Sequence, residues 1–234
     1  MTPAVRSTPG VLRAAWMIAR KDLRVEARNR ELVATTLFFG LACVLIFAFA
    51  FVREGQPIDG VAAGVIWVSV IFSGTVALGR AFERERQGET LRALLLAPIE
   101  RAAVFLGKLI ALLILMIGVE LLLVPFAALL FGAPIGRAPW LFAGLLLAGT
   151  VGFATVGTLF AAMLVRARSR DVLLPIVLYP MVVPIVIGGV VGTSALFDAD
   201  PNPDRAQAFL SMLVFFDAVF VTLALWTFGP VMSE

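Results

Sequence analysis

The sequence predicts an all-α integral membrane protein with six transmembrane helices. Of its 234 residues, 61% are hydrophobic and only 15% are charged, which is too apolar for a soluble domain of this size. Apolar runs of about 20 residues, the length that crosses the hydrocarbon core of a bilayer, recur along the chain. Because only short polar stretches separate these runs, we expect one membrane-spanning domain over residues 1–234.

A basic amphipathic helix is predicted over residues 11–30, before the first apolar run. Leu12, Trp16 and Leu23 fall on one face of this helix, and Arg20 and its basic neighbours lie to one side. A helix with a Trp on its apolar face and basic residues beside it is typical of a segment lying in the membrane interface. We therefore expect an interfacial helix here.

Six spans follow the interfacial helix. They are predicted over residues 32–52, 61–79, 103–131, 140–165, 172–191 and 208–231. An even number of spans puts both termini on one side, and 16 of the 19 Lys and Arg residues fall on that side; the other three are Arg53, Arg137 and Arg205. By the positive-inside rule, the termini and the charged stretch 81–108 are expected in the cytoplasm.

The charged stretch 81–108, between spans two and three, contains one short predicted helix at Glu89–Pro98. Leu91, Leu94 and Leu95 fall on one face at helical spacing, and Pro98 cannot continue the helix. One interpretation is a helix that offers a leucine face to a partner outside the bilayer. The alternative is an ordinary cytoplasmic loop that touches lipid headgroups.

Two acidic residues lie inside predicted spans, Glu120 in the third and Asp217 in the sixth, at similar expected depths. A carboxylate in lipid is costly, so each is expected to face the bundle interior, water or another subunit. Each acid either lines or gates a pathway, or is a protonated, hydrogen-bonded group that holds helices together.

Three prolines, Pro175, Pro180 and Pro184, interrupt the fifth span. Each removes a backbone donor and opposes a straight helix. We expect a kinked or broken helix, either beside a path or gate or as a static kink.

Several classes of chemistry are excluded by missing residue types. The sequence has no histidine, so it offers no imidazole metal ligand, His base or His haem ligand, and it has no G-x-x-x-x-G-K-[ST] loop for ATP phosphates. The single Cys43 lies in an apolar run and allows no internal disulfide. The net charge of +3 reflects membrane topology and does not suggest nucleic acid. We expect no catalytic residues, no metal site and no cofactor bound by this chain.

Three segments together resemble the CcmB family, the permeases of cytochrome c biogenesis within the ABC exporters. The segments are RKDLRVEARNRE before span one, ETLRALLLAPIERAAVFLGK between spans two and three, and LLPIVLYPMVVP in span five. Within the loop, the positions that match the family pattern are Glu85, Gly88, Thr90-Leu91, Leu94 to Leu96, Pro98 and Gly107-Lys108. The likeness covers nearly the whole chain.

The resemblance implies a complex in the bacterial cytoplasmic (inner) membrane. Its expected members are two permease copies, a CcmA-like ATPase that binds ATP, CcmC-like and CcmD-like membrane proteins and a CcmE-like haem chaperone. Haem is then a handled ligand, and a mechanical role in releasing the haem-loaded chaperone is favoured over conduction. The implied ATPase contacts, on what would be a coupling helix, are Glu85, Glu89, Thr90, Leu91, Arg92, Leu94, Leu95 and Pro98.

Two other functions remain open from the sequence. The first is an ABC permease that exports a lipid, drug or other hydrophobic solute. The second is a proton-coupled secondary carrier that uses Glu120 and Asp217 as proton sites, which leaves the charged leucine helix unexplained.

Overall fold

The computed structural model describes residues 10–53, 56–58, 60–87, 100–164 and 169–231, and these residues form seven helices and one short hairpin. The helices are α1 (Val11–Asn29), α2 (Glu31–Phe51), α3 (Val61–Gln87), α5 (Arg101–Phe131), α6 (Pro139–Met163), α7 (Arg170–Phe197) and α8 (Pro203–Val231); the strands are β1 (Val52–Arg53) and β2 (Gln56–Pro57). Every helix except α1 is long and apolar enough to cross a membrane. The predicted all-α fold with six spans is confirmed.

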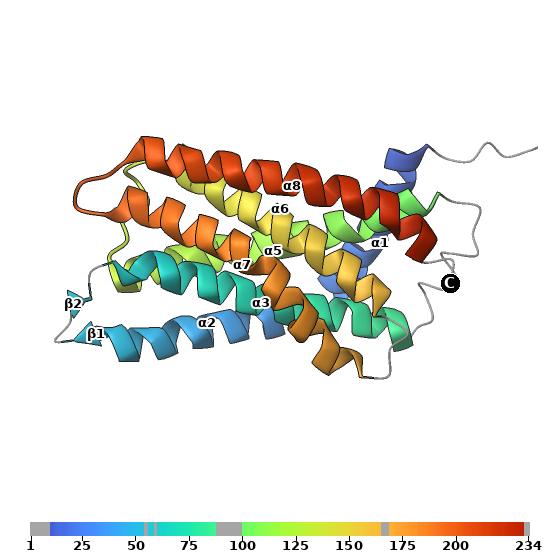
Figure 1. Cartoon of the computed structure of the whole chain (residues 1–234). Helices are drawn as coiled ribbons and strands as arrows, with labels where there is room; N and C mark the ends of the chain where they lie inside the picture. Colours follow the sequence, from blue (N-terminus) through green and yellow to red (C-terminus); the bar gives the residue numbers. More distant parts are fainter. Residues whose placement is uncertain (1–9, 54–55, 59, 88–99, 165–168, 232–234) are drawn as a thin grey trace, which may run out of the picture.

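The six long helices lie roughly parallel in one bundle, and α1 crosses them at one end (Figure 1). We call this end, where α8 also finishes, the terminal end. The opposite end, which carries β1, β2 and the α5–α6 and α7–α8 connections, is the hairpin end. Helix α3 contacts α2, α5, α6 and α7, and α6 contacts α3, α5, α7 and α8. Helix α5 contacts five helices, including α1, but α3 and α6 are the most buried of the six long helices and form the centre of the bundle.

The spans at the hairpin end are longer than predicted. Helix α7 continues to Phe197 and α8 begins at Pro203, so the predicted loop 192–207 shrinks to a few residues. Asn202 explains the early start of α8, because its side-chain oxygen accepts the Arg205 N–H at 2.9 Å and caps the helix. Proline is well suited to a first helical position, so Pro203 begins the helix where the sequence suggested a loop.

Helix α3 also extends beyond its predicted end at residue 79, to Gln87. The added turns consist of Arg, Glu and other residues with good helix propensity, so charge ends the apolar span without ending the helix. Helix α7 runs unbroken through its three prolines and bends in its first half (Figure 1).

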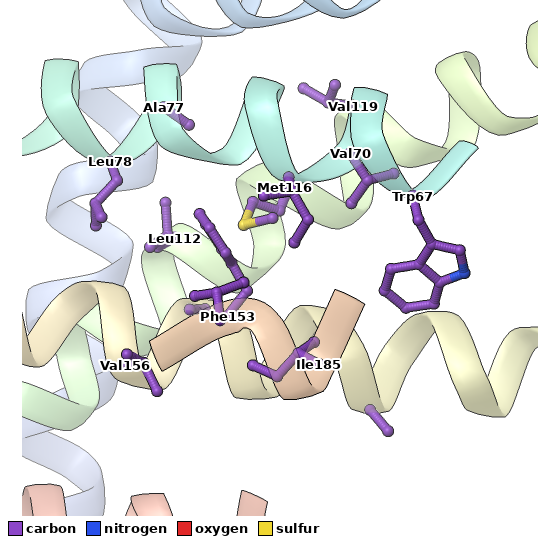
Figure 2. Packing of buried hydrophobic residues seen from close by; sticks show 14 of the residues in the cluster. Trp67, Val70, Ala77, Leu78, Leu112, Met116, Val119, Phe153, Val156 and Ile185 are labelled. Atoms are coloured by element: carbon purple, nitrogen blue, oxygen red, sulfur yellow. The ribbon is translucent and has the colours of Figure 1, made fainter. Parts of the chain in front are cut away.

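Trp67 of α3 lies in the bundle core and is fully buried. Its ring fits against two glycines: a Cβ added to Gly149 of α6 or Gly189 of α7 would lie 2.2 Å and 2.4 Å, respectively, from ring atoms. Its Nε1–H donates to Thr193 Oγ1 at 2.9 Å. Figure 2 shows the ring between α3 and its neighbours, near Ile185. Small residues on two helices thus create the space that one aromatic ring fills.

Candidate functional site

The predicted coupling helix lies outside the described residues, and so do Glu89, Thr90, Leu91, Arg92, Leu94, Leu95 and Pro98. Glu85 belongs to the last turns of α3. The structure does show the two helices that flank this stretch. Both α3, which ends at Gln87, and α5, which begins at Arg101, reach the terminal end of the bundle.

The start of α5 is held against the end of α8. The Arg101 guanidinium donates a hydrogen bond to the Gly229 carbonyl. One turn further on, the rings of Phe105 and Phe228 pack with centroids 5.3 Å apart. The first turns of α5 therefore contact the final span directly.

Glu120 lies inside the bundle, on the side of α5 that faces α6. It is 4% exposed, and its Oε1 lies 2.7 Å from Thr150 Oγ1 of α6. Of the three environments expected for Glu120, the structure shows the bundle interior. The partner that sequence reasoning could not name is a threonine hydroxyl.

Thr150 allows two hydrogen-bond arrangements at Glu120. The Thr150 hydroxyl also lies 2.8 Å from the Leu146 carbonyl oxygen, and a hydroxyl has one proton to donate. When Thr150 donates to Glu120, the acid can be a carboxylate. When Thr150 donates to Leu146, the contact with Glu120 requires a protonated carboxyl as the donor. The same geometry thus accommodates both forms of the acid.

Asp217 packs against α6 from α8. A Cβ added to Gly152 would lie 2.6 Å from Asp217 Oδ1, so this close approach depends on glycine. That oxygen is buried and has no hydrogen-bond partner among the described residues, although the Asp217 side chain as a whole is only half-buried.

The two acids contact α6 at nearly the same depth but from opposite sides. Thr150 and Gly152 are two residues apart, which is about 3 Å along the helix axis and about 200° around it. The prediction of similar depth is confirmed. The structure does not bring the two acids together, because α6 lies between them.

Buried hydroxyls line the cavity beside Glu120 and occur elsewhere in the core, and sequence reasoning missed them. Thr36 of α2 and Ser73 of α3 line a cavity of about 10 Å³ together with Glu120. That volume is close to the minimum for one water molecule. The hydroxyls without a hydrogen-bond partner among the described residues belong to Thr36, Ser69, Ser73, Thr155 and Thr158. The sequence feature that could have indicated them is a serine or threonine inside an apolar run.

The prolines of α7 do not line the cavity beside Glu120, although Pro184 lines a separate cavity with residues of α8 on either side of Asp217. Pro180 and Pro184 are exposed on the outer side of the helix, and Pro175 is half-buried. Within the part of the chain that the structure describes, no cluster of three or more acidic or cysteine side chains offers a metal site.

The fold and its polar level define the chain as a polytopic α-helical membrane protein. The family model described as "CcmB protein" matches residues 13–232. Heme exporter protein B of Paracoccus denitrificans is 32% identical over 213 residues, which covers 89% of this chain and 93% of that protein. Heme exporter protein B of Rhodobacter capsulatus is 31% identical over 170 residues, 72% of this chain and 77% of that protein.

Heme exporter protein B of Escherichia coli K12 is 35% identical over 96 residues, 41% of this chain, and the matched part spans only 44% of that protein's length. The family model and the Paracoccus relative both extend over most of the chain. The chain therefore belongs to the CcmB family, as the motifs in its sequence indicated.

Proposed function

We propose that this chain is the membrane permease subunit of a haem export system for cytochrome c maturation. In this proposal a partner ATPase binds the stretch at 89–98, and ATP hydrolysis changes the arrangement of the bundle. The change exports haem or releases a haem-loaded periplasmic chaperone. The observation that carries the proposal is membership of the CcmB family, whose relatives are named heme exporter protein B.

The geometry supports a mechanical role for α5. This helix begins just after the proposed ATPase contact, and its first residue, Arg101, bonds to the Gly229 carbonyl near the end of α8. Glu120 follows 19 residues later on the same helix, about 28 Å along its axis. A displacement at the terminal end would therefore reach both the last span and the buried polar level through one rigid element.

The residue types favour mechanical work over haem ligation. The sequence has no histidine, which removes the commonest protein ligand of haem iron. We therefore propose that CcmC-like, CcmD-like and CcmE-like partners hold the haem while this subunit couples ATP hydrolysis to their rearrangement. The carrier alternative receives less support, because α6 separates Glu120 from Asp217.

The decisive test replaces both leucines of the proposed contact, Leu94→Asp with Leu95→Asp. A small apolar cluster often contributes most of the binding energy of an interface, so two aspartates in its place should abolish ATPase binding. We expect normal membrane insertion, loss of ATPase co-purification and loss of cytochrome c maturation. Ser169→Asp, in the other terminal-end loop, is the control and should change none of these. Survival of both co-purification and maturation in the double variant would exclude the stretch as the ATPase contact.

The proposed orientation places the terminal end on the cytoplasmic side of a bacterial inner membrane. It rests on the 16-to-3 distribution of Lys and Arg between the two sides. In a Cys43→Ser background, a membrane-impermeant thiol reagent added to spheroplasts should label Asp200→Cys and not Thr90→Cys. Labelling in the reverse pattern would invert the orientation.

A further inference from the structure

A cavity of about 330 Å³ lies at the terminal end, between α1, α3, α5 and the first turn of α2. Its volume falls within the range of small-ligand sites. It shares no lining residue with the cavity beside Glu120. The cavity therefore needs its own explanation.

The walls of this cavity divide into a charged part and an apolar part. The charged part comprises Lys21, Asp22 and Glu26 of α1 and Lys108 of α5. The apolar part is formed chiefly by Phe82 of α3 with Leu112 and Leu115 of α5. A ligand that fills both parts must itself have a charged end and an apolar end.

The division coincides with the expected edge of the bilayer. Helix α5 has 31 residues, whereas about 20 cross the hydrocarbon core. Counting back about 20 residues from Phe131 at the hairpin end places the inner edge of that core near Ala111. Lys108 then lies at headgroup depth, while Leu112 and Leu115 lie at acyl-chain depth.

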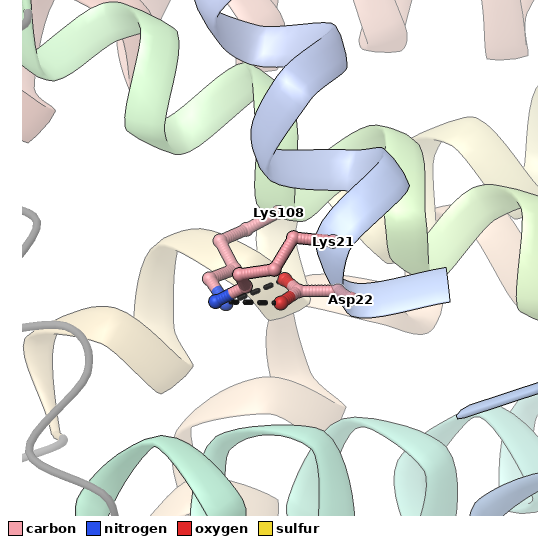
Figure 3. Close-up of polar contacts among 3 residues, drawn as sticks. All are labelled: Lys21, Asp22 and Lys108. Carbon is pink, nitrogen blue, oxygen red and sulfur yellow. Dashed lines mark hydrogen bonds and ion pairs between the residues drawn. The ribbon is translucent and has the colours of Figure 1, made fainter. Parts of the chain in front are cut away.

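The charged part is ordered and electrically balanced. Asp22 bridges two lysines: its Oδ2 lies 2.6 Å from Lys108 Nζ, and its Oδ1 lies 2.9 Å from Lys21 Nζ (Figure 3). Glu26 is 7% exposed, and its Oε1 accepts the Val33 N–H at 2.8 Å, so its position is fixed by the start of α2. Two acidic and two basic side chains give no net charge.

We propose that this cavity binds one zwitterionic phospholipid with a phosphoethanolamine headgroup. The lysines would bind the phosphate, and the carboxylates would accept hydrogen bonds from the primary ammonium. One acyl chain would lie along Phe82, Leu112 and Leu115. A phosphatidylglycerol headgroup would bring its negative charge to the same acids without a compensating ammonium, and a choline headgroup has no N–H to donate. The charge pattern therefore selects ethanolamine.

The first test asks whether the apolar half holds the lipid. Ala111→Trp places a large ring in the cavity, and the matched control Ile114→Trp adds the same ring to an exposed position of α5 that does not line it. The full chain, purified in mild detergent, is examined by native mass spectrometry for retained phospholipid. We expect one retained phosphatidylethanolamine in the wild type and in Ile114→Trp, and none in Ala111→Trp. Equal retention in both variants, or none in the wild type, would overturn the proposal.

The second test asks whether the charges select the headgroup, and it does not depend on the folding of a tryptophan variant. Delipidated wild-type protein is titrated with dioctanoyl phosphatidylethanolamine, phosphatidylcholine and phosphatidylglycerol while thermal unfolding is followed. We expect phosphatidylethanolamine to bind roughly tenfold tighter than phosphatidylglycerol, which is the difference that one hydrogen bond to a charged group would make. Glu26→Gln keeps an acceptor for Val33 but removes one negative charge, so it should abolish or reverse this preference. Equal affinities in the wild type, or an unchanged preference in Glu26→Gln, would refute headgroup recognition.

Discussion

Helices α6 and α8 pack against each other but use opposite kinds of residues. In the most apolar stretch of α6, 72% of the residues are buried, whereas in that of α8 only 11% are buried. The buried helix is rich in glycine and threonine, including Gly149, Thr150 and Gly152. The exposed one presents large side chains such as Phe215 and Trp226, which are 70% and 78% exposed.

This difference shows how the bundle is stabilised. Lipid tails are as apolar as leucine side chains, so burying an apolar side chain gains little over leaving it in the bilayer. Close packing and interhelical hydrogen bonds decide instead which surfaces meet. The glycines of α6 admit Trp67 and Asp217, its Thr150 reaches Glu120, and α8 turns its large residues outward.

The largest expected contrast is between two tryptophans. Trp67→Ala empties the space between α6 and α7 and removes the bond to Thr193, so we expect a loss of about 3–5 kcal/mol in the free energy of unfolding. Trp226→Ala, on the exposed face of α8, should cost less than about 0.5 kcal/mol. The measurement is reversible unfolding in mixed detergent micelles. Similar losses in the two variants would remove the distinction between the helices.

A middle-sized effect is expected at Glu120, which packs on one side of α6. Glu120→Ala leaves Thr150 facing a void, at a cost of about 1–3 kcal/mol, and should lower both protein level and cytochrome c maturation. Glu120→Gln keeps shape and hydrogen bonding but cannot titrate, so we expect a near-normal protein level and reduced maturation. The readouts are the amount of the chain in membranes and of cytochrome c with covalently attached haem.

Asp217→Asn provides the comparison from the other side of α6. Asp217 is only half-buried, so this change should affect protein level less than Glu120→Ala does.

For Glu120, full maturation in Glu120→Gln would show that titration of Glu120 has no role. Equal loss of protein in Glu120→Gln and Glu120→Ala would make Glu120 a packing residue.

The sequence was sufficient to predict the spans, because each hydrophobic run is long enough to cross the core and charges mark its ends. It was also sufficient to predict that Glu120 avoids lipid, but it left open whether the acid faces the bundle interior, water or another subunit. It could not predict which face of each span is buried. Apolar residues occur on both faces of α8, so periodicity carries little information there.

The hydrogen-bond partners of the buried groups could not be predicted from the sequence either. Thr193 lies 126 residues from Trp67, and Thr150 lies 30 residues from Glu120, and neither pair has a local sequence signal. Helix ends were misjudged for a different reason. Pro203 and the charges of Arg80–Gln87 suggested loops, yet proline begins a helix well and arginine and glutamate continue one.

The smallest expected contrast concerns single hydroxyls on α6 and α8. Thr150→Val removes the hydroxyl that joins Glu120 to α6, whereas Thr222→Val removes one that bonds only to the Ala218 carbonyl of its own helix on an exposed face. Hydrogen bonds between membrane helices contribute about 0.6 kcal/mol on average, so we expect a loss of about that size for Thr150→Val. For Thr222→Val we expect no loss, because a threonine that bonds to its own helix backbone does not strengthen the helix.

A double-mutant cycle tests whether glutamine can replace the acid in this contact. Thr150→Val and Glu120→Gln are measured singly and together by unfolding in mixed micelles, and the interaction energy is the departure from additivity. If the protonated acid donates to Thr150, glutamine can make the same donation with its amide N–H, so Thr150→Val should cost the same with Glu120 or Gln at this position and the two changes should be additive. Infrared spectra give an independent check: a carboxylic acid carbonyl band should be present in the wild type, absent in Glu120→Gln and shifted in Thr150→Val. If the carboxylic acid band region of the spectrum is unchanged by Glu120→Gln, Glu120 is a carboxylate, and Thr150 donates the hydrogen bond to it.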